Sequence, residues 1–232
     1  DGTLKWTQQL GTSSNERAQG VSTDSNNNVY ITGYTGASID GEPFYGVLDA
    51  FVTKYDSAGT KQWTKLLGTG AGEIAQGVST DSNNNVYITG YTSGSIDGQT
   101  TGGGSDAFVT KYDSSDGTLL WTKQLGTATT STEEAWGVST DSDNNVYITG
   151  YTTGDLAGTA GGNDAFVTKY NSAGTKLWTK QLGTTTSSSN EQAYGVATST
   201  AMITINSAFT TGEIYTAETF ASKLSTDLVK TV

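Results

Sequence analysis

One pattern of alternating apolar and polar residues recurs along the chain. Residues 85–92 read Asn-Val-Tyr-Ile-Thr-Gly-Tyr-Thr, and the same eight residues stand at 28–35 and 145–152. The alternation and the β-branched and aromatic content predict a strand. A unit copied with so little drift indicates a repeat protein, so the architecture is best predicted from the repeat.

Each unit contains four such segments. In the first unit they begin at Glu16, Val29, Asp49 and Thr60, and polar turns such as Asp-Ser-Asn-Asn-Asn and Asp-Ser-Ala-Gly separate them. Asp, Asn and Gly in these turns favour tight hairpins. Each unit is therefore predicted to form a four-stranded antiparallel sheet.

The spacing of equivalent tryptophans predicts the number of units. Trp63, Trp121 and Trp178 follow one another at intervals of 58 and 57 residues. A period of this size with four strands is typical of a β-propeller blade, whose sheet is apolar on both faces and stacks on its neighbours. Four such units account for the 232 residues of the chain. We therefore expect an all-β propeller of four blades that forms one domain.

The chain begins partway through a unit. Residues 1–10 match residues 116–125 closely, so we expect residues 3–10 to be the last strand of the fourth blade and to close the ring. The predicted division is residues 1–10 for that closing strand, 11–67 for blade 1, 68–125 for blade 2, 126–182 for blade 3 and 183–232 for a divergent blade 4.

The fourth unit loses the repeat pattern soon after it begins. Residues 201–209 and 213–220 are candidates for degenerate second and third strands, and residues 217–229 have the spacing of an amphipathic helix. Two other arrangements fit the same sequence. Residues 222–229 would supply the last strand and leave residues 3–10 free to pair with another subunit, or the chain would be part of a longer array.

Composition narrows the function classes. The net charge of -11 argues against binding to nucleic acid or anionic lipid, since both need clustered Lys and Arg. The chain has no Cys and no His, which excludes disulfides, thiolate metal sites and imidazole bases. No apolar run reaches membrane-spanning length. Because the chain opens on Asp1, we expect a mature or trimmed form.

The repeated motifs resemble a known family. Gly-Val-Ser-Thr-Asp-Ser-Asn-Asn-Asn-Val-Tyr-Ile-Thr-Gly-Tyr-Thr is followed by Gly-Ser-Ile-Asp-Gly, Asp-Ala-Phe-Val-Thr-Lys-Tyr and Leu-Trp-Thr-Lys-Gln-Leu-Gly. This composite resembles the SBBP family of bacterial β-propeller repeats over residues 1 to about 198, and its hairpin is similar to that of NHL propellers. The resemblance implies a secreted or surface-attached bacterial protein with a binding or scaffolding role. It also implies Gly in the hairpin, where Asn27, Asn84 and Asn144 or a neighbour stand here.

One acidic residue opens the first strand of every unit. With the first strand innermost, pseudo-fourfold symmetry would place four carboxylates around one axis, and a Ca²⁺ or Mg²⁺ ion would relieve their repulsion. The simpler interpretation is that each carboxylate bonds backbone amides at a junction between blades. The residues concerned are Glu16, Glu73, Glu133 and Glu191.

The polar hairpins begin like calcium-binding loops. Residues 24–28 and 141–145 have the Asp-x-Asn/Asp-x-Asn spacing, but Val29 and Thr35 stand where an EF-hand has Gly and Glu. Local turn chemistry explains these hairpins more simply. The same turn and cap role is expected of Asp40, Asp97, Asp49, Asp106 and Asp164.

Aromatic residues offer two further candidates. Trp6, Trp63, Trp121 and Trp178 recur at one strand position, where packing between blades is favoured over a sugar platform. A ligand site is expected instead where the copies differ, because its aromatic side chains could stack on a glycan or a peptide. The residues that differ are Arg17, Phe44, Tyr45, Trp136 and Tyr194.

We therefore expect a noncatalytic, extracellular or cell-surface binding or scaffold module of a bacterium. Its partners would be a protein or a glycan, with neither nucleic-acid binding nor membrane insertion. One alternative is a self-assembling filament or sheath subunit joined by strand exchange through residues 3–10. The other is a lectin or carbohydrate-active enzyme, for which Glu134 with Glu42 is the one carboxylate pair that breaks the repeat symmetry.

Overall fold

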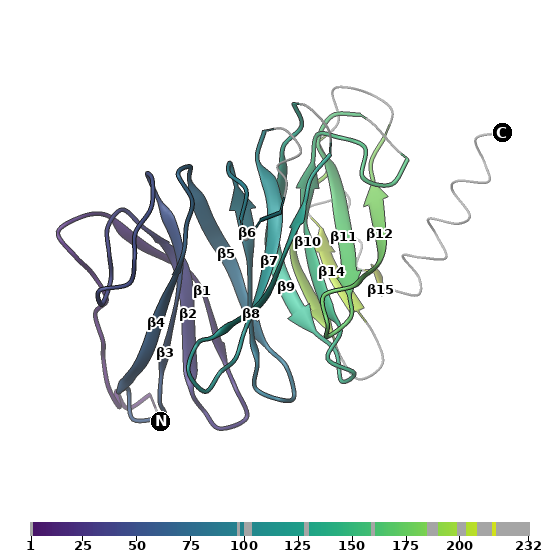
Figure 1. Ribbon diagram of the computed structural model, residues 1–232. Coiled ribbons are helices and arrows are strands. Elements are labelled where there is room, and N and C mark those ends of the chain that lie inside the picture. The colour runs from purple at the N-terminus through teal and green to yellow at the C-terminus, as the bar shows by residue number, and fades with distance from the viewer. Residues whose placement is uncertain are drawn as a thin grey trace.

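The chain forms a row of β-sheets (Figure 1). The computed structural model describes residues 2–96, 98–99, 104–127, 130–158, 161–184 and 190–198, and the strand path at 203–207 and 215–216. In the part of the chain so described, no helix has the length and apolarity to span a bilayer.

Three sheets of four strands correspond to the three complete units, which we number as blades 1 to 3. Blade 1 comprises β1 (Glu16–Thr23), β2 (Val29–Thr35), β3 (Asp49–Tyr55) and β4 (Lys61–Leu67). Blade 2 comprises β5 (Glu73–Thr80), β6 (Val86–Thr92), β7 (Asp106–Tyr112) and β8 (Leu119–Leu125). Blade 3 comprises β9 (Glu133–Thr140), β10 (Val146–Thr152), β11 (Asp164–Tyr170) and β12 (Lys176–Leu182).

Every complete blade is antiparallel, with its strands in sequence order from one edge to the other. The first strands contact one another in succession, β1 with β5, β5 with β9 and β9 with β13. The first strand of each blade is thus the inner strand, and β4, β8 and β12 are the outer edges. The predicted all-β architecture of four-stranded antiparallel blades is confirmed for these three units.

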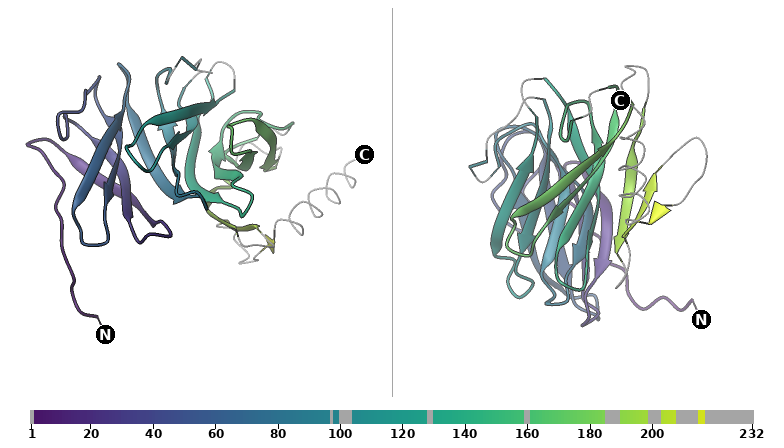
Figure 2. Two further views of the ribbon diagram at one scale, coloured as in Figure 1. Left: turned by 60° about the horizontal axis from the view of Figure 1, so that its bottom comes forward. Right: turned by 90° about the vertical axis from the view of Figure 1, so that its right-hand side faces the viewer.

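The fourth unit is described only in part. β13 (Ala193–Thr198), β14 (Ile203–Ser207) and β15 (Tyr215–Thr216) form an antiparallel sheet. β14 and β15 lie within the two ranges predicted for degenerate strands, and the helix predicted at 217–229 lies outside the described residues. This unit and blade 1 stand at opposite ends of the row in Figure 1 and in the left view of Figure 2. Blade number and ring closure therefore stay predictions.

The hydrophobic core lies between blades. Facing residues of blades 1 and 2, among them Val52 and Phe108, form one buried cluster, and Val109 and Phe166 belong to the cluster between blades 2 and 3. Each sheet is apolar on both faces because its neighbours cover both of them. This is the physical reason that the repeat has no consistently solvent-facing side in its second and third strands.

A tryptophan and a turn glycine complete each junction. Trp63 Nε1 donates to the carbonyl oxygen of Ser114 at 3.1 Å, and Trp121 Nε1 to that of Ser172 at 3.2 Å. Each indole lies over a glycine of the next blade's outer hairpin, where a side chain on Gly117 would meet Trp63 at 3.0 Å. The predicted packing of these tryptophans between blades is confirmed.

Each blade carries a β-bulge on its inner strand. The register between the first and second strands shifts once, so that one inner-strand residue is unpaired. The bulge brings the carbonyl oxygen of Arg17 so close to Gly33 that an added Cβ would lie 1.8 Å from it, which explains the glycine within the repeated strand. The unpaired residues are Gln19, Gln76, Trp136 and Tyr194. A second bulge recurs at the outer edge, where Gln62, Leu120 and Leu177 are the unpaired residues.

The N-terminal segment lacks a strand partner in the described structure. Residues 2–12, predicted to contain a strand, form no strand pair with any described residue. Trp6 nevertheless donates from Nε1 to the carbonyl oxygen of Ser57 at 3.2 Å, and a side chain on Gly59 would meet its indole at 2.6 Å. Trp6 thus contacts blade 1 as Trp63 contacts blade 2.

Candidate functional site

The acidic hairpins are held by turn chemistry. Asp81 accepts hydrogen bonds from the backbone amides of Asn83 at 3.0 Å and Asn85 at 2.8 Å, and from the Tyr87 hydroxyl at 2.9 Å. The Lys111 ammonium lies 3.6 Å from the same carboxylate. The carboxylate is therefore already surrounded by donors and a cation, which favours the turn interpretation over calcium.

The other two hairpins repeat this arrangement. Although burial raises the pKa of Asp24, hydrogen bonds from Asn28, Tyr30 and Asn26 hold it below its usual range on balance. The pKa of Asp141 is lowered in the same way, with Lys169 3.5 Å away adding to the effect. Asn27, at the hairpin position where Gly is typical of the family, adopts a left-handed φ of 61°. These hairpins stabilise the fold, and their sequence predicted that role.

The inner-strand glutamates each bond the loop that precedes them. Buried Glu73 accepts hydrogen bonds from the Thr69 amide, the Thr69 hydroxyl and the Thr92 hydroxyl, each at 2.7 Å. Glu16 and Glu133 make equivalent contacts within their own blades. No group of three or more acidic side chains is close enough to hold a metal within the described ranges. The axial cation at Glu16, Glu73, Glu133 and Glu191 stays a prediction.

A second set of carboxylates is buried at the junctions. Asp49, Asp106 and Asp164 open the third strands and are at most 1% exposed. Each carboxylate lies against a glycine after the outer strand, where a Cβ on Gly68 would come within 2.2 Å of Asp49. The turn-and-cap prediction for these residues therefore missed their burial. Asp40 does lie in a turn and accepts from Lys61, while Asp97 lies outside the described residues.

Burial raises the pKa of Asp49 from 3.8 to about 6, with a lowering contribution from the Tyr45 amide and a raising one from Glu73. The folded chain holds this proton more tightly than the unfolded chain, so stability falls as pH rises from about 4 to about 6. Asp49→Asn is expected to be more stable than the parent at pH 7.5 by about 1–2 kcal/mol. The gain should shrink at pH 4, as measured by urea unfolding.

Asp40→Asn is the matched control for that substitution. Burial raises the pKa of Asp40, but hydrogen bonds from Lys61 and Thr64 lower it on balance. Because a lowered pKa contributes stability above the unfolded pKa, this variant should lose stability at pH 7.5, by up to about 1 kcal/mol for a partly exposed pair. A loss of stability at pH 7.5 in both variants would contradict the raised pKa of Asp49.

Two of the residues predicted to bind a ligand come together. The Trp136 and Tyr194 rings stack with centroids 4.7 Å apart and planes 19° apart, and Tyr151 packs against Trp136 at 5.1 Å and 52°. Trp136 Nε1 donates to Glu134 Oε2 at 3.1 Å, and the Tyr194 hydroxyl donates to Gln192 Oε1 at 2.7 Å. These rings form an aromatic cluster at the bulges of β9 and β13.

The other predicted ligand residues lie on blade 1. Arg17 pairs with Tyr34 near the start of β1, while Phe44 and Tyr45 lie in the loop between β2 and β3. Tyr45 is 55% exposed, and its amide donates to Asp49 at 2.9 Å. The structure does not add these three residues to the aromatic cluster.

The carboxylate pair considered for glycoside hydrolysis is divided between blades. Glu42 lies in the β2–β3 loop, where the Lys65 ammonium is 3.2 Å from it, and Glu134 lies on β9 and accepts the indole N–H of Trp136. Two cooperating carboxylates must flank one bond. Glu42 and Glu134 instead bond separate structural partners, Lys65 and Trp136, and do not face each other across one site.

Sequence reasoning missed the partners of the aromatic cluster. Tyr34, Tyr91 and Tyr151 occupy one position of the second strands and pair with Arg17, Ile74 and Glu134 of the inner strands. Burial, with contributions from the charge of Glu134, raises the pKa of both Tyr91 and Tyr151. The sequence signal for this position is the residue after each inner-strand glutamate, because it differs in every unit. In chain order it is Arg17, Ile74, Glu134 and Gln192.

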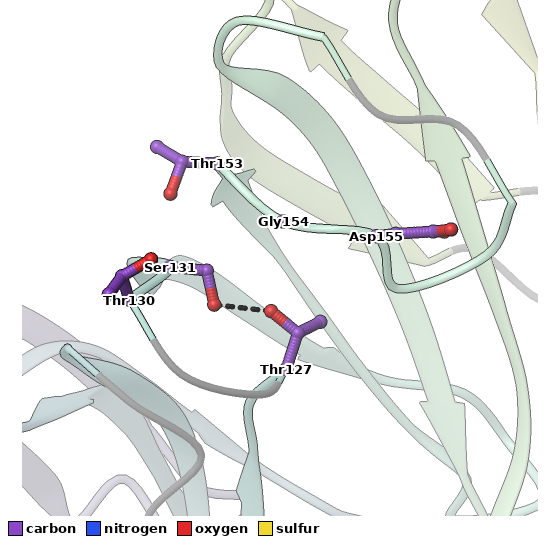
Figure 3. A pocket seen from close by; sticks show the side chains of 6 residues that line it. All are labelled: Thr127, Thr130, Ser131, Thr153, Gly154 and Asp155. Carbon is purple, nitrogen blue, oxygen red and sulfur yellow. Dashed lines mark hydrogen bonds between the residues drawn. The ribbon is translucent and has the colours of Figure 1, made fainter.

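A polar hollow of about 350 Å³ lies between two loops of blade 3 (Figure 3). It is lined by Thr127, Thr130, Ser131, Thr153, Gly154 and Asp155. The Thr127 and Ser131 hydroxyls bond each other and the buried Glu133 carboxylate. The side chains of Thr127, Ser131 and Glu133 thus satisfy one another's hydrogen bonds, and the hollow has little apolar surface for a ligand.

Comparison with known proteins agrees with this architecture. The sequence profile of SBBP, described as a beta-propeller repeat, matches residues 5–40, 62–97 and 120–157. An uncharacterised WD repeat-containing protein of Acanthamoeba polyphaga mimivirus is 26% identical over 246 positions, which cover 84% of this chain and 18% of that protein. This chain therefore corresponds to under a fifth of that relative.

Proposed function

Because the chain belongs to the SBBP family of β-propeller repeat proteins, we propose that it is a noncatalytic binding and scaffold module that closes on itself as a four-bladed ring. Its site of action is outside a bacterial cell or on its surface, and its partners are proteins or glycans. The net charge of -11 supports an extracellular location, because it favours solubility and opposes contact with nucleic acid.

The position of Trp6 is the observation that carries the proposal. Its indole N–H donates to the outer hairpin of blade 1, just as the indoles of Trp63 and Trp121 donate to the outer hairpins of blades 2 and 3. The SBBP repeat also begins just before this tryptophan, at residue 5. This position supports residues 3–10 as the outer strand of a blade that precedes blade 1, and the described residues of the fourth unit include no outer strand.

Blade 1 also carries the acceptor of a hydrogen bond that is complete at the other junctions. Ser25 bonds Asn84 Oδ1 of the next blade, Ser82 bonds Asn144 Oδ1, and the corresponding Asn27 receives no such bond among the described contacts. Val21 is 69% exposed although its equivalent Val78 is 9% exposed. A blade packed on this face would use both features, and closure of the ring would bring the chain's own fourth unit there.

The filament subunit is the competing function. In that case residues 3–10 would complete the last blade of a neighbouring chain, as in strand addition. The contact of Trp6 with its own blade 1 is expected in both arrangements, so the mass of the chain in solution has to separate them. A catalytic function has less support than a binding function, because the acidic side chains recur once per blade with the same structural partners.

Trp6→Ala tests the closed module. Loss of the indole should lower the free energy of unfolding by about 2–3 kcal/mol, less than for a fully buried Trp because this one is half-buried, and a thermal melt measures it. Leu4→Ala, in the same segment but 77% exposed, should change it by under about 0.5 kcal/mol.

The mass of the parent chain decides between module and filament. Light scattering should give 24.2 kDa from micromolar to millimolar concentration. A mass that grows with concentration, together with a Trp6→Ala variant that melts like the parent but no longer assembles, would establish the filament instead.

A further inference from the structure

Two positions of the inner strand vary in an otherwise copied unit. One is the residue after the first glutamate, and the other is the unpaired residue of the bulge two positions later. The pairs are Arg17 with Gln19, Ile74 with Gln76, Glu134 with Trp136, and Gln192 with Tyr194. The Glu before each pair, the Ala within it and the Gly after it are the same in all four units. Packing therefore does not dictate these two side chains.

The inner strands lie next to one another, so their bulges form one row. The carbonyl oxygen of Gln76 would be 3.2 Å from a Cβ on Gly20, and that of Trp136 would be 3.0 Å from one on Gly77. Successive bulges are thus in direct contact along the inner edge of the blades. Bulges often redirect side chains next to functional sites. We call the four unpaired residues defined above, with Gln192, the bulge row.

One end of the bulge row is an aromatic plane with its polar atoms satisfied. Tyr194 is 56% exposed, and the stack on Trp136 fixes its ring. The hydrogen bonds to Glu134 and Gln192 use both the indole N–H and the Tyr194 hydroxyl. The outer surface of the ring is therefore a rigid apolar plane, which binds at low entropic cost.

The remainder of the bulge row is neutral and polar. Gln19 is exposed and Gln76 is half-buried, and a primary amide both donates and accepts hydrogen bonds. No hydrogen bond from the side-chain N–H groups of Gln192 to another described residue is seen, so within that part of the chain they remain available to a ligand. Glu134, which is not part of the bulge row, is half-buried, and one of its carboxylate oxygens accepts the indole N–H of Trp136.

We infer that the bulge row binds a neutral saccharide, with the C–H face of a sugar ring on Tyr194 and sugar hydroxyls on the amides of Gln76 and Gln192. An aromatic plane bordered by amides matches the two kinds of surface on a sugar ring, one apolar and one with alternating donors and acceptors. Anionic sugars are disfavoured by the net charge of -11. This inference rests on the proposed function as a binding module.

Titration of the full chain with neutral hexasaccharides tests it. Cello-, laminari-, manno- and chitohexaose are each followed by calorimetry and by quenching of tryptophan fluorescence, since Trp136 lies beneath the expected sugar. At least one should bind, and Tyr194→Gln, which introduces the residue type of blades 1 and 2, should weaken that binding at least tenfold. The variant should stay folded and melt only about 2–5 °C below the parent, because it loses the stack on Trp136; this separates lost binding from lost folding.

Leu120→Gln is the matched control. Leu120 is the unpaired residue of an outer bulge and is 47% exposed, so its replacement removes similar apolar surface outside the bulge row and should leave affinity unchanged. Failure of all four saccharides to bind, equal binding by Tyr194→Gln, or binding of a proline-rich or cationic peptide in their place would overturn the inference. A monomeric chain that binds no saccharide overturns this inference alone, whereas a polymerising chain overturns the proposed function.

Discussion

Asp81→Ala is expected to lower the free energy of unfolding by about 3–5 kcal/mol. The carboxylate is buried and accepts bonds from two backbone amides and from the Asn85 and Tyr87 side chains. Its loss also leaves the Lys111 ammonium, itself nearly buried, without the carboxylate 3.6 Å away. For a chain of this size the melting temperature should fall by roughly 10 °C, which calorimetry or a thermal melt measures.

The matched control for Asp81 is Asp113, which holds a hairpin in the same blade. It accepts bonds from the Ser115 amide at 2.8 Å and the Ser115 hydroxyl at 2.6 Å, yet it is only half-buried and makes no ion pair with a buried lysine among the described residues. Asp113→Ala should cost about 1 kcal/mol. Equal losses for the two variants would show that the loss arises in the hairpin turn and not from the buried ion pair.

Much of each blade could be predicted from the sequence because the same strand and turn motifs occur in three successive units. The strand at Val29–Thr35 was predicted to the residue, and its copies in blades 2 and 3 repeat it. The turns were readable because Asp and Asn have a local preference that no distant contact overrides. The prediction of tryptophans between blades also held, since a large ring in a stacked sheet has few other places to lie.

What could not be predicted depends on how the strands and loops of a blade come together. Asp49 has the sequence context of a cap, and its burial depends on Gly68 approaching from the neighbouring outer strand. For Glu73 a bond to a backbone amide was the simpler expectation, but the sequence did not identify Thr69 and Thr92 of its own blade as its partners. Trp136 stood out as a difference between copies, but the bulge that orients it requires the register of two strands.

The ends of the row show why closure matters for stability. In a stack of identical sheets each blade is stabilised by its neighbours, and a terminal blade is left with one uncovered face. Blade 1 exposes Val21 on that face. The N-terminal segment supplies Trp6 there, so the first ten residues stabilise a blade to which they do not belong.

Glu73→Ala and Glu16→Ala compare the same repeat position in a buried and an exposed setting. Glu73 is fully buried, and its loss leaves the Thr69 amide and hydroxyl without this acceptor and leaves the Thr92 hydroxyl with only the Gly94 carbonyl oxygen. Because bonds to a charged acceptor are among the stronger ones, the expected loss is about 3–4 kcal/mol. Glu16 makes the equivalent bonds to Thr12 and Thr35 at the edge of the row, where water can replace it, so the loss should be under about 1 kcal/mol.

The same pair of variants separates a structural role from an axial cation. A cation shared by all four glutamates would raise the melting temperature of the parent when Ca²⁺ replaces a chelator, and removal of either Glu73 or Glu16 would abolish that rise. The hydrogen bonds predict instead that the parent melts at one temperature in both solutions and that the two variants differ by about 2–3 kcal/mol. Because water reaches Glu16 and not Glu73, burial and not membership of a ring of charges would then set the cost of each replacement.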